Sequence, residues 1–298
     1  GRREEWTSIW PPESYAWLDA RIRRGQDYVK AKALSRSRAW LSRLTRRVKQ
    51  DAYTPVYTAQ SALSAWIGDT RITQDPPAIS SEQIHAAALE MRPGDIILER
   101  RNWFLSNAFL PGFWPHGALY VGTAEDVKRL GIAERPEIKA RWAEFTRPGE
   151  PLTVIESVSE GVIFNTLSHS IHADHVAVLR PRGLTPEQIG EAIARAFSHQ
   201  GKPYDFEFDF FTSDKLVCTE LVYRAYEDFL HFDLVRVMGR DTLPALEIAR
   251  KFARERGTPA AQLDFVLFLD AVPGEQKALR VGPEVLVESI DREKSFGR

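Results

Sequence analysis

Five short runs of aliphatic and β-branched residues between positions 95 and 179 most constrain the fold of this chain. Turn residues separate the runs, as they do between the strands of a sheet. Because parallel strands need long crossover connections, the short spacing predicts antiparallel neighbours. We therefore expect an antiparallel sheet at the centre of the molecule. The runs are DIILE (95–99), GALYV (117–121), LTVIES (152–157), VIFNTL (162–167) and HVAVL (175–179).

Helical patterns surround these strands. Ser80 with Gln83, and Thr185 with Gln188, have the spacing of a capping box, so each pair predicts a helix start. From Cys218 onward apolar residues recur at helical spacing, which places Cys218 at the first turn of a buried helix. The mixture predicts an α+β domain in which the antiparallel sheet packs on helices. Other expected elements are a helix over 241–256, a strand over 265–269 and an extended or irregular tail from 274.

The first 77 residues differ from the rest. They contain five of the eight tryptophans in helix-compatible segments and end at the breaker run Asp75-Pro76-Pro77. We predict a helical N-terminal region over 1–77 and a second domain over 78–298. Within 21–50, eleven Lys and Arg residues stand against one acid, and Leu34, Leu41, Leu44 and Val48 recur at helical spacing.

This basic segment, 21–50, predicts an amphipathic helix that could contact an anionic membrane surface. The alternative is a helix packed through its apolar stripe, with its basic face in water. Aromatic residues are not interleaved with the charges, so nucleic acid is not an expected partner. The chain contains no apolar run near the roughly 18–20 residues that span a bilayer.

The start of the chain, GRREEW, has neither an initiator Met nor an apolar signal core. A leader could have been removed, so the sequence does not define the compartment. If a leader was removed, the protein would be periplasmic or membrane-peripheral. The sequence does not predict an oligomeric state.

Cys218 is the sole cysteine, which excludes an internal disulfide framework and a zinc cluster built on cysteines. A helix N-terminus and a neighbouring imidazolium lower the pKa of a thiol, so Cys218 could be a nucleophile. The alternative is a small buried hydrophobic side chain. Nucleophilic chemistry therefore requires a base close to Cys218 in space.

His116 is the main candidate for that base. It follows Trp114-Pro115 and opens an apolar strand beside Gly117, where a substrate could reach the imidazole. Glu156 stands in the middle of another apolar strand, where a carboxylate is costly unless it is paired. An acid that accepts from the second imidazole nitrogen orients a catalytic base. The alternative for Glu156 is an edge strand facing water, and His175 is a rival for the base.

Taken in order, these motifs resemble the permuted papain-like amidases of the YiiX kind. That group is similar to the lecithin:retinol acyltransferase relatives and to NlpC-type cell-wall peptidases, except that the histidine precedes the cysteine. The family histidine is usually followed by a bulkier apolar residue, whereas this chain has Gly117. The motifs are RPGDIIL (92–98), HGALYVG (116–122), the Glu156 strand with Gly161-Val162 after it, GKPYD (201–205) and VCTELV (217–222).

The resemblance implies a circularly permuted papain-like fold with an N-terminal helical extension. It also implies Cys218 as nucleophile, His116 as general base and then general acid, and Glu156 as the residue that orients His116. Tyr204 would help to hold an oxyanion together with the Cys218 amide, with plain aromatic packing as the alternative. The expected reaction is hydrolysis of an amide or ester through an acyl-enzyme.

Aromatic residues suggest a lipid-like acyl substrate over a cell-wall peptide stem, with Trp114, Phe113 and Phe211 as the candidate pocket. The sequence is also compatible with two alternative functions: acyl transfer through the same residues, and non-catalytic lipid or membrane binding. No metal or organic cofactor is expected. The clusters considered and set aside as zinc or calcium sites are His169, His172 and His175, and Asp205, Glu207, Asp209 and Asp214.

Overall fold

The computed structural model describes residues 76–102, 112–205, 216–237 and 240–292. All of these belong to one unit, residues 71–298. The predicted basic helix at 21–50, nearly all of the predicted N-terminal region and Phe211 lie outside the described residues. No helix in the described ranges has the length and apolar character needed to cross a membrane.

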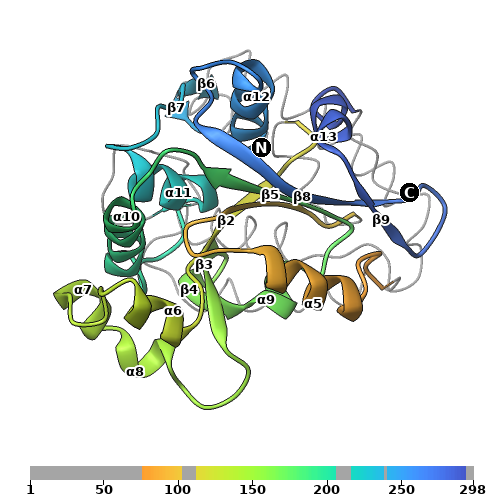
Figure 1. The fold of residues 1–298 in the computed structure, drawn as a ribbon. Coiled ribbons are helices and arrows are strands. Elements are labelled where there is room, and N and C mark those ends of the chain that lie inside the picture. The colour runs from red at the N-terminus through yellow and green to blue at the C-terminus, as the bar shows by residue number, and fades with distance from the viewer. Residues whose placement is uncertain (1–75, 103–111, 206–215, 238–239, 293–298) are drawn as a thin grey trace, which may run out of the picture. The chain divides into compact units, whose positions relative to one another are not determined.

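An antiparallel seven-stranded sheet forms the centre of the unit, in the order β4-β3-β2-β1-β5-β8-β9 (Figure 1). The five predicted runs all form strands of this sheet, and the predicted strand at 265–269 lies within β8, so the antiparallel α+β prediction is confirmed. The bounds are β1 Ile96–Arg100, β2 His116–Tyr120, β3 Leu152–Val158, β4 Gly161–Thr166, β5 His175–Pro181, β8 Leu263–Ala271 and β9 Ala278–Val281, and a separate hairpin joins β6 Val235–Val237 to β7 Arg240–Thr242.

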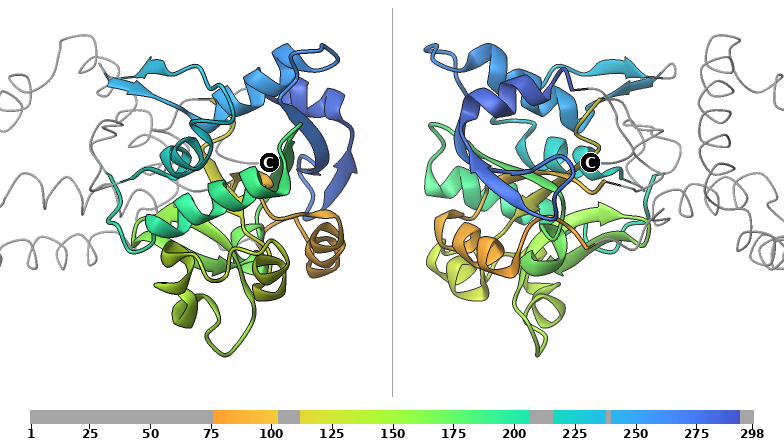
Figure 2. Two further views of the ribbon diagram at one scale, coloured as in Figure 1. Left: turned by 60° about the vertical axis from the view of Figure 1, so that its left-hand side comes forward. Right: turned by 90° about the vertical axis from the view of Figure 1, so that its right-hand side faces the viewer.

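The sheet divides the apolar core into two layers. Ile96 and Leu98 of β1 face one layer and Ile97 faces the other, because successive side chains of a strand alternate. In Figure 2 the orange helix α5 and the blue helix α12 lie on opposite sides of the sheet. The first layer contains α6 Ala124–Arg129, α7 Pro136–Lys139, α8 Trp142–Phe145, α10 Pro186–Ser198, α11 Cys218–Tyr226, α12 Ala245–Glu255 and α13 Pro283–Ser289, and the second contains α5 Ser81–Glu90 and α9 Leu167–Ser170.

The helix predictions hold at most boundaries. Full capping boxes start α5 at Ser80 and α10 at Thr185, as predicted. The helix expected from 241 instead begins at Ala245, because Pro244 is its N-cap and the residues before it pair as β7. The tail from 274, expected to be extended or irregular, instead contains strand β9 and helix α13. Pro283 is the first residue of α13, a position that favours proline.

The turn at 92–95 ties helix α11 to the sheet. Gly94 has φ +96°, and a Cβ there would lie 2.9 Å from Ile189 Cγ2, so only glycine fits without strain. Its amide donates to the Tyr120 carbonyl at 2.7 Å, and its carbonyl accepts from the Tyr226 hydroxyl at 2.5 Å. Since Tyr226 ends α11, this turn fixes α11 against β1 and β2.

Candidate active site

Three elements bring the predicted catalytic residues together. Cys218 is the first residue of α11, His116 the first residue of β2, and Glu156 lies in β3. His116 Nε2 lies 2.8 Å from Glu156 Oε2. The imidazole is close enough to the Cys218 thiol for each group to shift the other's pKa, while the thiol itself lies 4.0 Å from the Pro115 carbonyl oxygen. Because Nε2 is engaged by Glu156, Nδ1 is the nitrogen that remains for Cys218. The arrangement is that of a thiol, a base and an orienting acid.

Glu156 is held by donors on both carboxylate oxygens. Oε2 accepts from His116, while Oε1 accepts from Asn165 Nδ2 at 2.8 Å and Ser170 Oγ at 2.7 Å. Burial alone would raise the pKa of Glu156, but these hydrogen bonds lower it to about 2. The alternative of a water-facing edge strand is wrong, since β3 lies between β4 and β2 and Glu156 is 2% exposed. Glu156 is therefore an ionised acid fixed in one orientation.

Cys218 and His116 shift each other's pKa. Burial would raise the pKa of the thiol, but His116 and the backbone amides of Gly117 and Thr219 bring it below the usual value. Burial would lower the pKa of His116, yet the thiolate and Glu156 raise it well above the usual range. The pair is therefore favoured as thiolate and imidazolium at neutral pH, which is the reactive form of a cysteine nucleophile.

The first turn of α11 leaves its amides available to the Cys218 thiol. Helices α5, α6 and α10 each begin with a full capping box, whereas the N-cap of α11 is Val217, which has no polar side chain. A Ser or Thr cap would take up an amide of this turn. Instead the Thr219 amide stabilises the Cys218 thiolate.

Gly117 gives the start of α11 its close approach to β2. A Cβ on Gly117 would lie 3.0 Å from Thr219 Cγ2, closer than an ordinary contact. The methyl group of Thr219 thus occupies the space that a bulkier residue after His116 would need. This contact accounts for the departure from the family pattern.

Substituting Gly117→Ala is expected to slow alkylation of Cys218 about 10-fold, because the new methyl pushes Thr219 and the thiol away from His116. The rate is measured by mass spectrometry of the intact protein. Thr219→Ser removes Cγ2 and should restore the rate in the double variant. A Gly117→Ala protein that reacts like wild type, or a double variant as slow as the single one, contradicts this explanation.

Tyr204 is close enough to Cys218 to be affected by its charge, and two of the sequence motifs interlock next to Tyr204. Gly161 has φ +108°, and a Cβ there would lie 2.4 Å from the Lys202 carbonyl oxygen. The Val162 amide donates to that oxygen at 2.8 Å, and Tyr204 forms a bridge with Leu216. Burial and the neighbouring Cys218 raise the pKa of Tyr204 well above its usual range, so its hydroxyl stays protonated and able to donate.

The family described as permuted papain-like amidase enzyme, YaeF/YiiX, C92 family, matches residues 90–263. The protein belongs to this amidase family. Among solved structures, that of metalloprotein yiiX from Escherichia coli O157:H7 is similar at 19% identity, over 65% of this chain and 97% of that chain, with a TM-score of 0.37. No curated protein matches the chain.

The amidase-family match includes the catalytic candidates, Tyr204 and two of the predicted pocket residues. Trp114 is 0% exposed and donates from Nε1 to Ser289 Oγ at 2.9 Å, and Phe113 is 5% exposed. Both rings therefore pack in the core, and a role in a substrate pocket stays a prediction that this burial does not favour. Phe211 lies outside the described residues.

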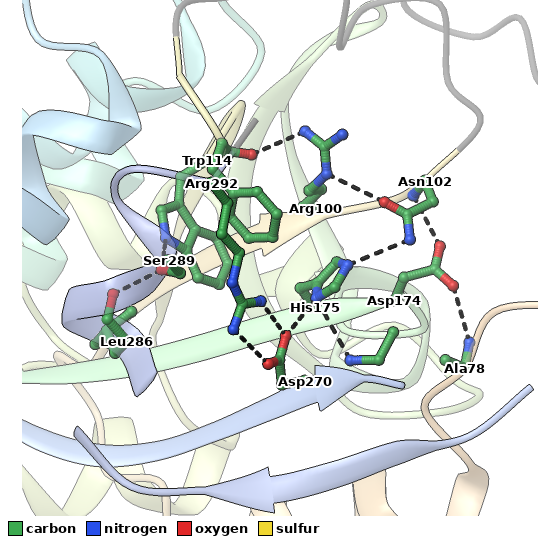
Figure 3. A network of polar contacts seen from close by, with 12 residues as sticks. Ala78, Arg100, Asn102, Trp114, Asp174, His175, Asp270, Leu286, Ser289 and Arg292 are labelled. Atoms are coloured by element: carbon green, nitrogen blue, oxygen red, sulfur yellow. Dashed lines mark hydrogen bonds and ion pairs between the residues drawn. The ribbon is translucent and has the colours of Figure 1, made fainter. Parts of the chain in front are cut away.

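His175 belongs to a separate polar network (Figure 3). Its Nδ1 lies 2.7 Å from Asp270 Oδ1 and its Nε2 lies 3.2 Å from Asn102 Nδ2. Both ring nitrogens are thus engaged away from Cys218, and burial lowers the pKa of the imidazole. The rival assignment of His175 as the base therefore has no free nitrogen to support it.

The same network holds the chain on both sides of residues 103–111. Arg100 Nε donates to Asn102 Oδ1 at 3.1 Å, and Arg100 Nη1 donates to the Phe113 carbonyl at 2.9 Å. Arg292 makes two bonds to Asp270, at 2.7 and 2.8 Å. Asp270 and Arg292 lie beyond the family match, so the C-terminal residues of this chain anchor the segment that leads to His116.

Glu99 is a site residue that the sequence analysis missed. It pairs with His116 across β1 and β2, and oxygen or nitrogen atoms of Glu99, His116 and Glu156 all lie within 4.8 Å of one another. Burial raises the pKa of Glu99, while Arg101, whose Nε lies 2.5 Å away, and His116 oppose this shift. Two carboxylates and one imidazole are a donor set that suits a divalent transition-metal ion.

Proposed function

We propose that the protein is a cysteine-dependent amidase or esterase that works through an acyl-enzyme on Cys218. Membership of the amidase family supports a hydrolase. The observation that carries the proposal is the position of His116, which Glu156 engages through Nε2 and which is close enough to Cys218 to lower the pKa of the thiol. A thiolate beside an imidazolium can attack a carbonyl carbon without a separate deprotonation step.

In the acylation step, Cys218 Sγ bonds to the carbonyl carbon and the carbonyl oxygen takes the negative charge. The Cys218 amide and the Tyr204 hydroxyl are the proposed donors to that oxygen. The C–N or C–O bond then breaks as His116 gives its Nδ1 proton to the leaving amine or alcohol. In the second step water loses a proton to His116 and attacks the thioester, which releases the acid and restores the thiolate–imidazolium pair.

The substrate class is proposed as a lipid-like acyl amide or ester, with a cell-wall peptide stem as the alternative. Because Phe113 and Trp114 are buried, they do not support an apolar substrate pocket. Lipid-like substrates and cell-wall peptides therefore both belong in the first substrate screen. An amine or hydroxyl acceptor in place of water would make the same site an acyltransferase.

The proposal is tested by mass spectrometry of the intact protein after brief exposure to a small acyl probe at pH 7. We expect one adduct, absent in Cys218→Ser, that forms quickly and then disappears as water resolves the thioester. Slow labelling, no faster than that of a free cysteine in a peptide, would reject the enzyme. It would favour a non-catalytic lipid-binding protein, with the basic segment 21–50 as the proposed membrane contact.

A second candidate function is metal-dependent hydrolysis at the same place, favoured by the proximity of Glu99, His116 and Glu156. These side chains would hold a divalent cation, which can polarise a carbonyl group or lower the pKa of a bound water. Activity that survives Cys218→Ser and disappears with a chelator would support this candidate. Activity lost on alkylation of Cys218 and unaffected by a chelator would support the thiol.

A further inference from the structure

Three neighbouring strands of the sheet place Arg100, His175 and Asp270 in a row (Figure 3). Arg100 of β1 pairs with His175 of β5, which pairs with Asp270 of β8, and cross-strand partners have their side chains on one face. Arg100 is 1% exposed and His175 is 7% exposed. His175 Nδ1 lies 2.7 Å from Asp270 Oδ1 and 3.4 Å from the Ala271 amide nitrogen. The direction of the shorter hydrogen bond therefore indicates where the proton of the imidazole lies.

The partners of His175 fix its protonation state. Both oxygens of Asp270 accept from Arg292, at 2.7 and 2.8 Å, so Asp270 is an ionised acceptor and His175 Nδ1 must donate to it. On the other side, Arg100 Nε donates to Asn102 Oδ1 at 3.1 Å, which turns the Asn102 NH₂ group toward His175 Nε2, 3.2 Å away. Nε2 must then accept. His175 is therefore neutral, with its single proton on Nδ1.

The same side chains hold Phe113, which lies three residues before His116. Arg100 Nη1 donates to the Phe113 carbonyl at 2.9 Å. The guanidinium groups of Arg100 and Arg292 lie 4.9 and 5.3 Å from the centre of the Phe113 ring. The imidazole of His175 packs edge-on against that ring, with 4.9 Å between the ring centres. Two cations, one hydrogen bond and one ring contact therefore fix Phe113.

A short segment, 113–116, joins this ring to the catalytic pair. His116 begins β2, and the Pro115 carbonyl oxygen lies 4.0 Å from Cys218 Sγ. Proline restricts its own φ angle and the conformation of the residue before it, so the segment has few ways to absorb a displacement at Phe113. Movement of Phe113 is therefore expected to move His116 relative to Cys218.

We propose that neutral His175 is a positioning residue for the catalytic base: by joining Asn102 to Asp270 it keeps segment 113–116, which ends at the base, in place. The inference rests on the proposed function. A second proton on His175 points Nε2–H at the NH₂ group of Asn102, so two donors face each other. Asn102 can accept from that N–H only by turning its oxygen away from Arg100, which removes one acceptor from a buried guanidinium. Protonation of His175 therefore loosens the hold on this segment.

The charges around His175 place this change in mildly acidic solution. Burial and Arg100 lower the pKa of His175, Asp270 and Asp174 oppose the shift, and the result lies below the ordinary value of 6.5. Arg292 is the other charged group of the network and is paired with Asp270. A histidine whose pKa is depressed on folding leaves the fold at full stability above its unfolded pKa, and stability is lost as the pH falls through the folded value. The network is therefore expected to be intact at pH 7 and to weaken below about pH 6.5.

The test measures the second-order rate constant for alkylation of Cys218 by iodoacetamide in the full chain, from pH 7.5 to 5. Asn102→Asp replaces the NH₂ group with an acceptor, so protonated His175 can donate from both nitrogens. The rate of wild type relative to Asn102→Asp should be near one at pH 7.5 and fall several-fold by pH 5, because only wild type loses the network. His231→Gln changes a histidine whose side chain is 82% exposed and should follow wild type at every pH.

Arg292→Gln provides a second variant, at a side chain that is 30% exposed. Without the arginine charge, Asp270 stabilises protonated His175 more strongly, so the midpoint of the loss in alkylation rate should move to higher pH. A midpoint that is unchanged or lower overturns the positioning role. So does a ratio of wild type to Asn102→Asp that stays flat to pH 5.

Thermal unfolding provides a readout that needs no reactive thiol. The Tm of wild type should fall relative to that of Asn102→Asp as the pH falls from 7 to 5. If this Tm difference appears while the alkylation ratio stays flat, the network only stabilises the fold and the positioning role is wrong. If alkylation is slow and unaffected by His116→Ala, the proposed function fails, and the Tm comparison still shows whether protonation of His175 breaks the network.

Discussion

Replacing His116 with alanine is expected to slow alkylation of Cys218 about 10- to 300-fold at pH 6, and far less at pH 9. The thiol then loses the imidazolium that lowers its pKa, while the burial that raises it remains. A thiol with the free-cysteine pKa of about 8.5 is roughly 0.3% ionised at pH 6 and about 75% ionised at pH 9. The lower limit allows for the weaker nucleophilicity of a thiolate of low pKa. The measurement is the alkylation rate across this pH range.

His172, an exposed histidine in the loop before β5, provides the matched control. His172→Ala should alkylate like wild type at every pH. Turnover of an acyl substrate by His116→Ala should fall further, by about 10²- to 10⁴-fold, because the base and acid for proton transfer are both lost. Equal alkylation rates of His116→Ala and wild type at pH 6 would mean that no ion pair forms.

The elements that carry the site were predictable because each has a local signal. The apolar runs that became β2 and β3 place His116 and Glu156 on strands, and the helical spacing after Cys218 places the thiol in a first turn. The ordered motifs then indicated which residues meet. Positive φ angles at Gly94 and Gly161 explain why two of those motifs contain glycine.

The partners of these residues were not predictable, because strand register and distant segments select them. Asn165 and Ser170 reach Glu156 through the β3–β4 pairing and the short helix α9. Glu99 lies beside His116 only because β1 and β2 pair in one register. A polar residue at the end of an apolar run carries no sequence signal that distinguishes these positions from solvent-facing ones.

Trp114 and Phe113 show that the burial of a side chain is equally hard to predict from sequence. An aromatic cluster next to a catalytic histidine predicts a pocket and a core equally well. The outcome depends on Ser289, which is far away in the sequence and accepts from Trp114, and on Arg100 and Arg292, whose guanidinium groups lie 4.9 and 5.3 Å from the Phe113 ring centre. Tertiary contacts of this kind decide burial.

Substituting Glu156→Gln is expected to reduce turnover about 10²- to 10⁴-fold with little change in the fold, as an Asp-to-Asn exchange does in the serine-protease triad. Asn165 and Ser170 both donate to Oε1 of Glu156, so the oxygen of glutamine should occupy that side and its NH₂ group should face His116. His116 Nε2 must then accept, which leaves the proton on Nδ1. That tautomer has no lone pair directed at Cys218 and cannot act as a base.

The prediction is measured by the lifetime of the acyl adduct on Cys218 in intact-protein mass spectra, because deacylation depends on His116 as base. Glu156→Gln should form the adduct slowly and retain it much longer than wild type. Glu160→Gln, in the exposed turn between β3 and β4, should behave like wild type. The expected lifetime in Glu156→Gln is longer than that of wild type by a factor of about 10² or more. A lifetime within about threefold of wild type would show that Glu156 does not set the tautomer of His116. The imidazole would then be oriented by other contacts, with Glu99 as an acid close to it.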